Sequence, residues 1–204
     1  MRKTVLAVVV VTALIAAGFY IERWRVHPER LKGLEHAVAE LHAAQSLGMV
    51  QTEHKTLLRD VFAEYDLVQR GTLNESERRL VRGYPAAIDV CRNTGVIWSG
   101  VEIVPAPSLS GKYTLYKVKP EALDALTAIG IPNVPSKLFI VDIERSVLIE
   151  AALGICDAAL DSARNGGSEA EVKSAIRPAV ATESSTINNI FRNSERVQSL
   201  VGRN

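Results

Sequence analysis

The sequence is poor in the residues from which most recognisable sites are built. It holds two cysteines and four histidines in 204 residues, and aromatic residues make up 5%. So few aromatics exclude the stacking platforms that hold single-stranded nucleic acid. The charges almost cancel, with 24 basic and 23 acidic side chains and a net charge of +1. Because nucleic-acid-binding proteins carry a clear basic excess, no nucleic-acid partner is predicted.

The familiar catalytic and cofactor motifs are also missing. The sequence has no G-x-S-x-G, P-loop, G-x-G-x-x-G or S-x-x-K pattern. The histidines form no H-E-x-x-H pattern, and His36 and His42, six residues apart, do not share a helix face. We therefore expect solvated histidines, with a surface pair between His36 and Glu40. No cofactor, no metal and no enzymatic activity are predicted.

One long hydrophobic run lies at the N-terminus. Arg2 and Lys3 precede an uncharged stretch from Thr4 to Ile21, which is 18 residues long. As a helix it spans roughly 27 Å, close to the thickness of a membrane's hydrocarbon core. Two interpretations fit: residues 1–25 are an uncleaved membrane anchor, or they include a signal peptide that is cleaved near Gly18.

The residues after the run favour the anchor. Tyr20 and Trp24 stand where an aromatic belt lies, and Arg23 and Arg25 can reach lipid head groups. Basic residues are nearly balanced across the run, so the orientation rests on the export order of basic, apolar and small residues. We expect a single-pass inner-membrane protein whose residues 26–204 form an extracytoplasmic, mostly helical domain. The alternative is a protein secreted after cleavage.

Residues 29–70 have the pattern of helix. Four apolar residues, which we name the N-terminal seam, are spaced by three, four and three positions: Leu31, Leu34, Val38 and Leu41. Ser46 and Gly48 mark a break, so the segment is either one bent helix or a helical hairpin. Packing inside the domain is the commoner use of so short a seam. Its place between the membrane and the break nevertheless makes it our candidate for self-association or a protein partner.

Start and stop signals divide the chain after residue 70. Residues 72–75, Thr-Leu-Asn-Glu, are predicted to be a capping box, and Pro85 is expected to kink or restart the following helix. Residues 99–118 combine prolines and glycines with β-branched residues and are predicted to form a small β-hairpin or an extended loop. Pro120 and Gly130 bound another helix.

A long central helix is predicted from Ser136 to about Arg164. Residues 138–141, Leu-Phe-Ile-Val, fit a strand by themselves, but polar residues recur at helical spacing from Asp142 onward and favour a helix. The acidic members of this stripe are expected to be solvated, because a row along one helix does not converge on a cation: Asp142, Glu150, Asp157 and Asp161.

The C-terminal part is predicted to contain two helices. Ser168 and Glu171 have the spacing of a second capping box, which begins a short helix toward Pro178. The last helix is predicted from about Ser185 to Val201. Proline loses an amide donor and clashes with the preceding turn, which is why the first helix is expected to end there.

The cysteines, Cys91 and Cys156, leave two interpretations open. They do not form C-x-x-C, so a thioredoxin-like motif is absent. Each lies in an apolar helical stretch and fits a small buried hydrophobe. In an oxidising compartment they can instead form a disulfide.

Taken together, these patterns predict a mainly α fold with an N-terminal transmembrane helix followed by a bundle-like domain. The function that fits best is an interaction or scaffold domain of a bacterial envelope assembly. The alternative is an exported module that binds a small ligand between its helices. A scaffold is expected to expose an apolar patch, whereas a ligand module is expected to contain a pocket of roughly 300 Å³ or more.

Overall fold

The computed structural model describes residues 29–104 and 114–201. The predicted anchor or signal peptide lies outside these residues, as do its interface residues Tyr20, Arg23, Trp24 and Arg25. No helix in the described ranges is long and apolar enough to cross a membrane. The described body is mainly helical with one small antiparallel sheet, in agreement with the predicted fold class for that part of the chain.

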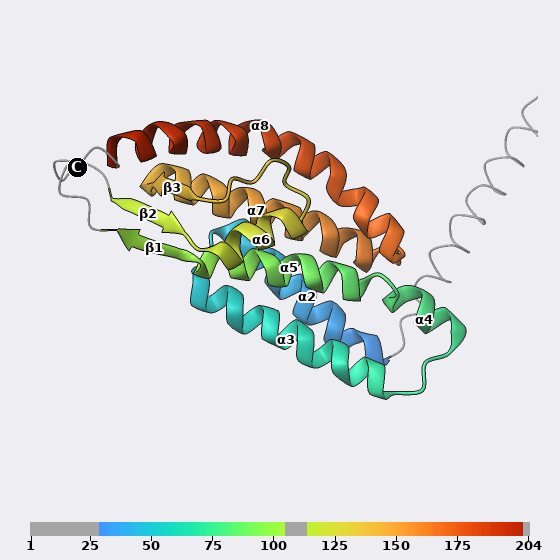
Figure 1. The fold of residues 1–204 in the computed structure, drawn as a ribbon. Helices are drawn as coiled ribbons and strands as arrows, with labels where there is room; N and C mark the ends of the chain where they lie inside the picture. Colours follow the sequence, from blue (N-terminus) through green and yellow to red (C-terminus); the bar gives the residue numbers. More distant parts are fainter. Residues whose placement is uncertain (1–28, 105–113, 202–204) are drawn as a thin grey trace, which may run out of the picture.

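The segment with the N-terminal seam is a helical hairpin. Helix α2 (Glu29–Leu47) and helix α3 (Gln51–Arg70) lie side by side and are joined by a short turn (Figure 1). Gly48 has a φ of 82°, a conformation that glycine adopts without the steric cost of a Cβ atom. Of the two predicted alternatives, the structure therefore has the helical hairpin and not the single bent helix.

The next two helices are separated near the position of Pro85. Helix α4 (Glu75–Val81) is followed by helix α5 (Tyr84–Ser99), which has Pro85 in its first turn, so the proline restarts the chain's helical path. The capping box of α4 is shifted from the predicted one. The Asn74 side chain accepts from the Glu77 N–H at 2.9 Å, and the Asn74 N–H donates to Glu77 Oε2 at 2.7 Å.

The predicted hairpin belongs to a three-stranded sheet. Strands β1 (Val101–Val104), β2 (Leu115–Val118) and β3 (Leu138–Val141) follow one another in the order β1-β2-β3, and both neighbouring pairs are antiparallel. Between β2 and β3, helix α6 (Pro120–Ala128) begins at its proline and ends before Gly130, which has a φ of 96°. This helix confirms the predicted boundaries.

The prediction of a helix beginning at Ser136 is wrong. Residues 138–141 form β3, and helix α7 (Asp142–Arg164) begins only after them. Pairing with β2 satisfies the backbone groups of these residues, and Leu138 and Ile140 are fully buried on one face of the resulting sheet. The polar periodicity on which the prediction rested begins at Asp142, where α7 does begin.

The predicted break at Pro178 is also wrong. Helix α8 (Glu169–Val201) runs through Pro178 and bends along its length (Figure 1). A proline inside a helix removes one amide donor, and the long contact of α8 with α7 and β3 stabilises the helix on both sides of it. The predicted cap is present, since Ser168 Oγ accepts from the Glu171 N–H at 3.3 Å.

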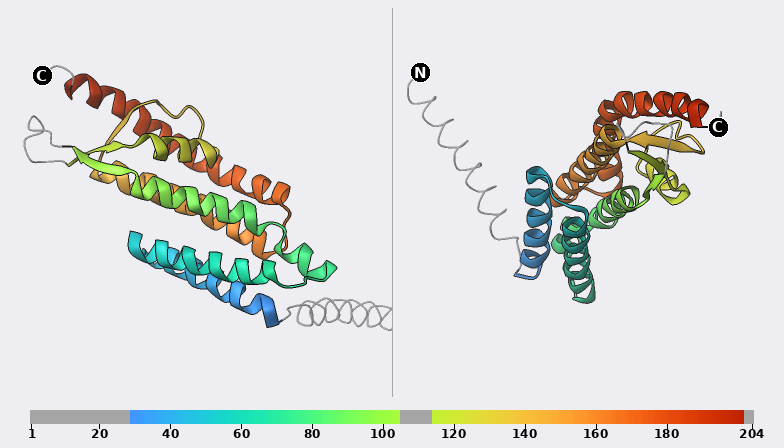
Figure 2. Two further views of the ribbon diagram at one scale, coloured as in Figure 1. Left: turned by 60° about the horizontal axis from the view of Figure 1, so that its bottom comes forward. Right: turned by 90° about the vertical axis from the view of Figure 1, so that its left-hand side faces the viewer.

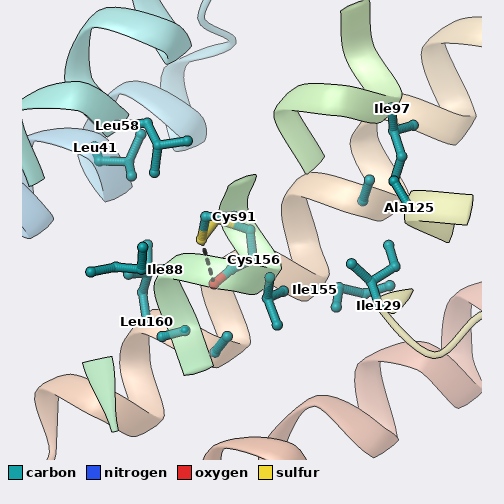
Figure 3. Packing of buried hydrophobic residues seen from close by; sticks show 14 of the residues in the cluster. Leu41, Leu58, Ile88, Cys91, Ile97, Ala125, Ile129, Ile155, Cys156 and Leu160 are labelled. Atoms are coloured by element: carbon teal, nitrogen blue, oxygen red, sulfur yellow. Dashed lines mark hydrogen bonds between the residues drawn. A yellow bond between two sulfur atoms is a disulfide. The ribbon is translucent and has the colours of Figure 1, made fainter. Parts of the chain in front are cut away.

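Helices α5 and α7 form the middle of the domain. The α2–α3 hairpin packs on one side of them, α8 packs against α7 on the other, and the sheet lies at one end (Figures 1 and 2). Figure 3 shows Ile155 and Leu160 within the buried cluster that this arrangement creates.

The N-terminal seam is part of this core, so its use as an uncovered interface is wrong. Leu31, Leu34, Val38 and Leu41 are between 0% and 3% exposed. The turn at Gly48 folds α3 back onto α2, and α2 also contacts α7, so the seam is covered from within the domain. The large apolar side chains that remain exposed lie elsewhere: Val50, Leu67, Ile103 and Ile143.

The buried seam gives a stability prediction. Leu34→Asp combined with Leu41→Asp places two carboxylates in the apolar core, and the free energy of unfolding is expected to fall by several kcal/mol. Thermal melting followed by circular dichroism measures the loss. Ala43→Asp, on the exposed side of the same helix, is the matched control and is expected to leave the melting temperature nearly unchanged. An unchanged melting temperature in the double variant would show that the N-terminal seam is exposed and not part of the core.

Candidate functional site

A disulfide joins the two central helices. Cys91 of α5 and Cys156 of α7 are bonded, and their Cα atoms are 4.7 Å apart. Both residues are fully buried, and Figure 3 shows them near Ile88, Ile155 and Leu160. Of the two interpretations that the sequence leaves open, the structure has the disulfide.

Polar side chains of α2 meet α7 beside this disulfide. Gln45 Nε2 donates to Cys156 Sγ at 3.4 Å, while its carbonyl oxygen is buried without a partner among the described residues. One turn earlier on α2, His42 Nδ1 lies 3.0 Å from an oxygen of Asp157. Burial raises the pKa of the Asp157 carboxyl, and the bond to His42 opposes this rise. The hairpin is thus held to α7 by polar contacts as well as by the N-terminal seam.

His54 contradicts the prediction that the histidines are solvated. It is 0% exposed, and neither ring nitrogen has a hydrogen-bond partner among the described residues. Its ring centroid lies 5.6 Å from that of Trp98, and a Cβ atom on Gly95 would lie 3.7 Å from its Cε1. Burial lowers the pKa of His54, because the imidazolium would lose its hydration there. His54 is therefore a neutral packing residue between α3 and α5.

The other predicted polar features divide into two groups. His36 and Glu40 form the expected exposed pair, with 3.3 Å between Nε2 and Oε1. Glu150 and Asp161 are exposed, as a solvated stripe requires. Asp142 and Asp157 instead have specific partners. Asp142 accepts from the Tyr116 hydroxyl at 2.8 Å and from the Thr114 N–H at 3.0 Å, and these bonds lower its pKa. Within the described ranges no group of histidine, cysteine or acidic residues could hold a metal ion.

The two edges of the sheet differ. At the β3 edge, α8 packs against the strand and the buried Ser194 Oγ accepts from the Phe139 N–H at 2.8 Å. At the β1 edge, no further strand pairs with β1 among the described residues, and the side chain of Ile103 is 69% exposed. One edge is capped, and the other is open.

The open edge presents the backbone of Val101 and Ile103. Hydrogen-bonded and non-hydrogen-bonded pairs alternate along an antiparallel ladder. Gly100 accepts from the Lys119 N–H at 2.8 Å, so the register directs the backbone groups of Glu102 and Val104 to β2. The N–H and C=O groups of Val101 and Ile103 therefore point away from the sheet, where an added strand would bond to them.

A groove of about 330 Å³ lies between α8 and the chain that follows α6. Ile129 and Pro132 line one side of it, and Ile176, Val180 and Ala181 of α8 line the other. Lys173 and Arg177, one helical turn apart, stand at the same groove. It is a mostly apolar hollow with two cations, and no sequence pattern predicts it.

A second hollow of about 310 Å³ lies between the end of α3 and α4. It is more polar, and its two arginines are already engaged. Arg78 Nε donates to the Leu73 carbonyl at 3.1 Å, and Arg82 pairs with Glu171 at 3.2 Å. A ligand there would have to replace existing bonds, so this hollow is a poorer candidate than the groove.

No protein-family model matches the chain, and the comparisons with curated proteins and with solved structures give no significant match. Its candidate functional features are therefore those of its own structure, namely the disulfide, the open β1 edge and the groove.

Reduction of the disulfide is expected to destabilise the folded domain. The chain-entropy relation for cysteines 65 residues apart gives a loss of about 4 kcal/mol in the free energy of unfolding. Chemical denaturation with and without a reductant measures this difference. Without reductant, neither cysteine is expected to react with an alkylating reagent. The Cys91→Ala, Cys156→Ala double variant is the control, whose stability should not respond to the reductant. Alkylation of the folded, unreduced protein would contradict the bond.

Burial of His54 predicts a loss of stability on mild acidification. The unfolded chain takes up a proton near the ordinary pKa of about 6.5, whereas the folded chain resists it. The free energy of unfolding therefore keeps its full value above that pH. It declines as the pH falls through it, by up to about 1.4 kcal/mol per pH unit. Denaturation curves between about pH 7.5 and 5 measure the slope.

The matched variants separate His54 from the other titrating groups. His54→Leu removes the buried titrating group and is expected to flatten the dependence, while His36→Gln on the surface should leave it unchanged. The raised pKa of Asp157 acts with the opposite sign, because its folded form holds a proton more tightly than the unfolded form. A slope that survives in His54→Leu would assign the acid sensitivity to another group.

Proposed function

We propose that this chain is a membrane-anchored, extracytoplasmic interaction domain that serves a bacterial envelope assembly. Its N-terminal run holds it at the membrane, and its helical body binds a protein partner. The observation that carries the proposal is the disulfide between α5 and α7, because such bonds persist in oxidising compartments and are rare in the cytosol. The basic, apolar and small-residue order of residues 2–18 supports export independently.

The open edge of the sheet supports an interaction role and indicates where a partner binds. Natural proteins usually cover or blunt a sheet edge, as α8 and Ser194 do at β3. The β1 edge carries the apolar Val101 and Ile103, and its outward backbone groups suit addition of an extended segment. This edge takes the place of the N-terminal seam as the proposed partner surface.

Cell fractionation tests the location. The full chain, expressed in a Gram-negative host, is expected to stay in the membrane pellet after a carbonate wash. Protease added to spheroplasts should degrade the body, and alkylation should find Cys91 and Cys156 bonded. A variant that lacks residues 4–21 is the control and should leave the pellet. A soluble product that begins near Phe19 would support the secreted alternative, and a body protected in spheroplasts would contradict export.

Co-purification from detergent extracts tests the interaction. Ile103→Pro removes an outward N–H while leaving the β1–β2 ladder intact, because the Ile103 N–H points away from β2. This variant is expected to lose the proteins that accompany the wild-type chain. Leu67→Ser, a change of another exposed apolar residue on α3, should keep them. Equal sets of proteins with all three chains would exclude the β1 edge as the partner surface.

The groove beside α8 favours a second candidate function. Its volume of about 330 Å³ lies at the lower end of the range for small-molecule sites, and a few polar groups accompany its apolar walls. These are the features expected of an exported module that binds a small ligand between its elements. The two candidate functions use different surfaces, so one chain can carry both.

A further inference from the structure

We infer that the groove between α8 and residues 129–132 binds a single-chain amphiphile that carries a carboxylate, such as a medium-chain fatty acid. The inference rests on the second candidate function alone. It is independent of the membrane anchor and of the β1 edge. Three features of the groove support it: its shape, its apolar walls and one uncommitted cation.

The shape follows from the path of the chain on both sides. After α6, the positive φ of Gly130 turns the chain so that residues 129–132 run beside α8 (Figures 1 and 2). On the other side, Pro178 lies inside α8 and removes one amide donor from its hydrogen-bond ladder. The groove is lined by α8 residues from Lys173 to Ser184, so it extends along the helix on both sides of this proline.

The walls favour an apolar body of limited size. Pro132, Ile176 and Val180 offer hydrocarbon surface, whereas Ile129 is itself fully buried, and Ala181 leaves space because its side chain is small. The hydroxyl of Ser184 already donates to the Val180 carbonyl, so it adds little polarity. A volume of about 330 Å³ suits one short chain and is too small for a lipid with two chains.

The charge of the ligand follows from the two cations. Lys173 pairs with Glu169 through Nζ and Oε1 at 2.5 Å, so its charge is already balanced. Arg177 makes no ion pair or hydrogen bond with any residue that the structure describes, and it stands at the edge of the apolar surface. A guanidinium group binds a carboxylate through two parallel hydrogen bonds, and this makes a carboxylate the matching head group.

Photoaffinity labelling of the full chain in membranes tests the inference. The probe is a decanoic acid that carries a diazirine in its chain, and the labelled peptides are identified by mass spectrometry. Labelling is expected within residues 129–132 and 173–184. An excess of decanoate should prevent it, while decyltrimethylammonium, which has the same chain and the opposite charge, should not.

Two variants and one control assign the recognition to the groove. Arg177→Ala should reduce labelling at subsaturating probe by about tenfold or more, which is the usual effect of losing a charge-assisted hydrogen bond. Ala181→Trp should block the groove without disturbing the core, because Ala181 is exposed. Arg192→Ala changes another exposed arginine of α8 outside the groove and should leave labelling unchanged. Equal melting temperatures confirm that the variants are folded.

The contrary outcomes are equally defined. Labelling that survives both Arg177→Ala and Ala181→Trp, or that maps to other peptides, would show that the probe only partitions into the membrane. Competition by decyltrimethylammonium would show that the groove recognises the chain and not the carboxylate. Either result overturns the inference, and neither changes the outcome of the carbonate wash or of the Ile103→Pro co-purification.

Discussion

The close packing of α5 against α7 is the contact on which the other elements depend. Small residues recur one turn apart on α5, at Ala87, Cys91 and Gly95, and α7 offers Ala152 and Cys156. Small side chains let the helices approach closely, and the disulfide fixes that approach covalently at one level. One turn of the helix beyond it, the Thr94 hydroxyl donates to the Ala152 carbonyl, so a buried polar group is satisfied within the same contact.

Each side of this central pair then receives one layer. The hairpin covers α5 and α7 with the N-terminal seam and with His54, whose ring packs beside Gly95 and Trp98. On the far side, α8 follows α7 and extends beyond it to cover β3. Among the described residues no further strand pairs with the outer edge of β1, and this is why an interaction surface is proposed there and not on the helices.

Sequence patterns were sufficient where a local signal decided the structure. Gly48, Pro85, Pro120 and Gly130 mark real boundaries. The prolines fix φ and the glycines adopt a positive φ without steric cost, and neither property depends on distant residues. The helix predicted for residues 138–141 is wrong because their state depends on β2, a partner 20 to 26 residues away. The helix break predicted at Pro178 is wrong for the same reason, since the packing of α8 against α7 and β3 outweighs the loss of one amide donor at the proline.

The candidate sites show the same division. The residues of the disulfide were identifiable, because two cysteines allow one pairing, but whether they pair depends on the approach of α5 and α7. No sequence pattern predicts the groove, because Ile129 and Arg177 are far apart in the chain. They line the same groove only once the chain after α6 lies beside α8. The burial of the N-terminal seam likewise depended on the direction in which α3 returns after Gly48.

The positions of the two cysteines also give the domain a closed covalent ring. Residues 91–156 form the ring, which contains the second half of α5, the whole sheet, α6 and about the first two thirds of α7. A single peptide-bond break anywhere inside it leaves one molecule, with α2–α3 still linked to α8 through the sulfur bridge. The elements on the two flanks of the core thus stay connected by a path that bypasses the sheet. A partner that pulls on β1 acts on this ring and not on a linear chain.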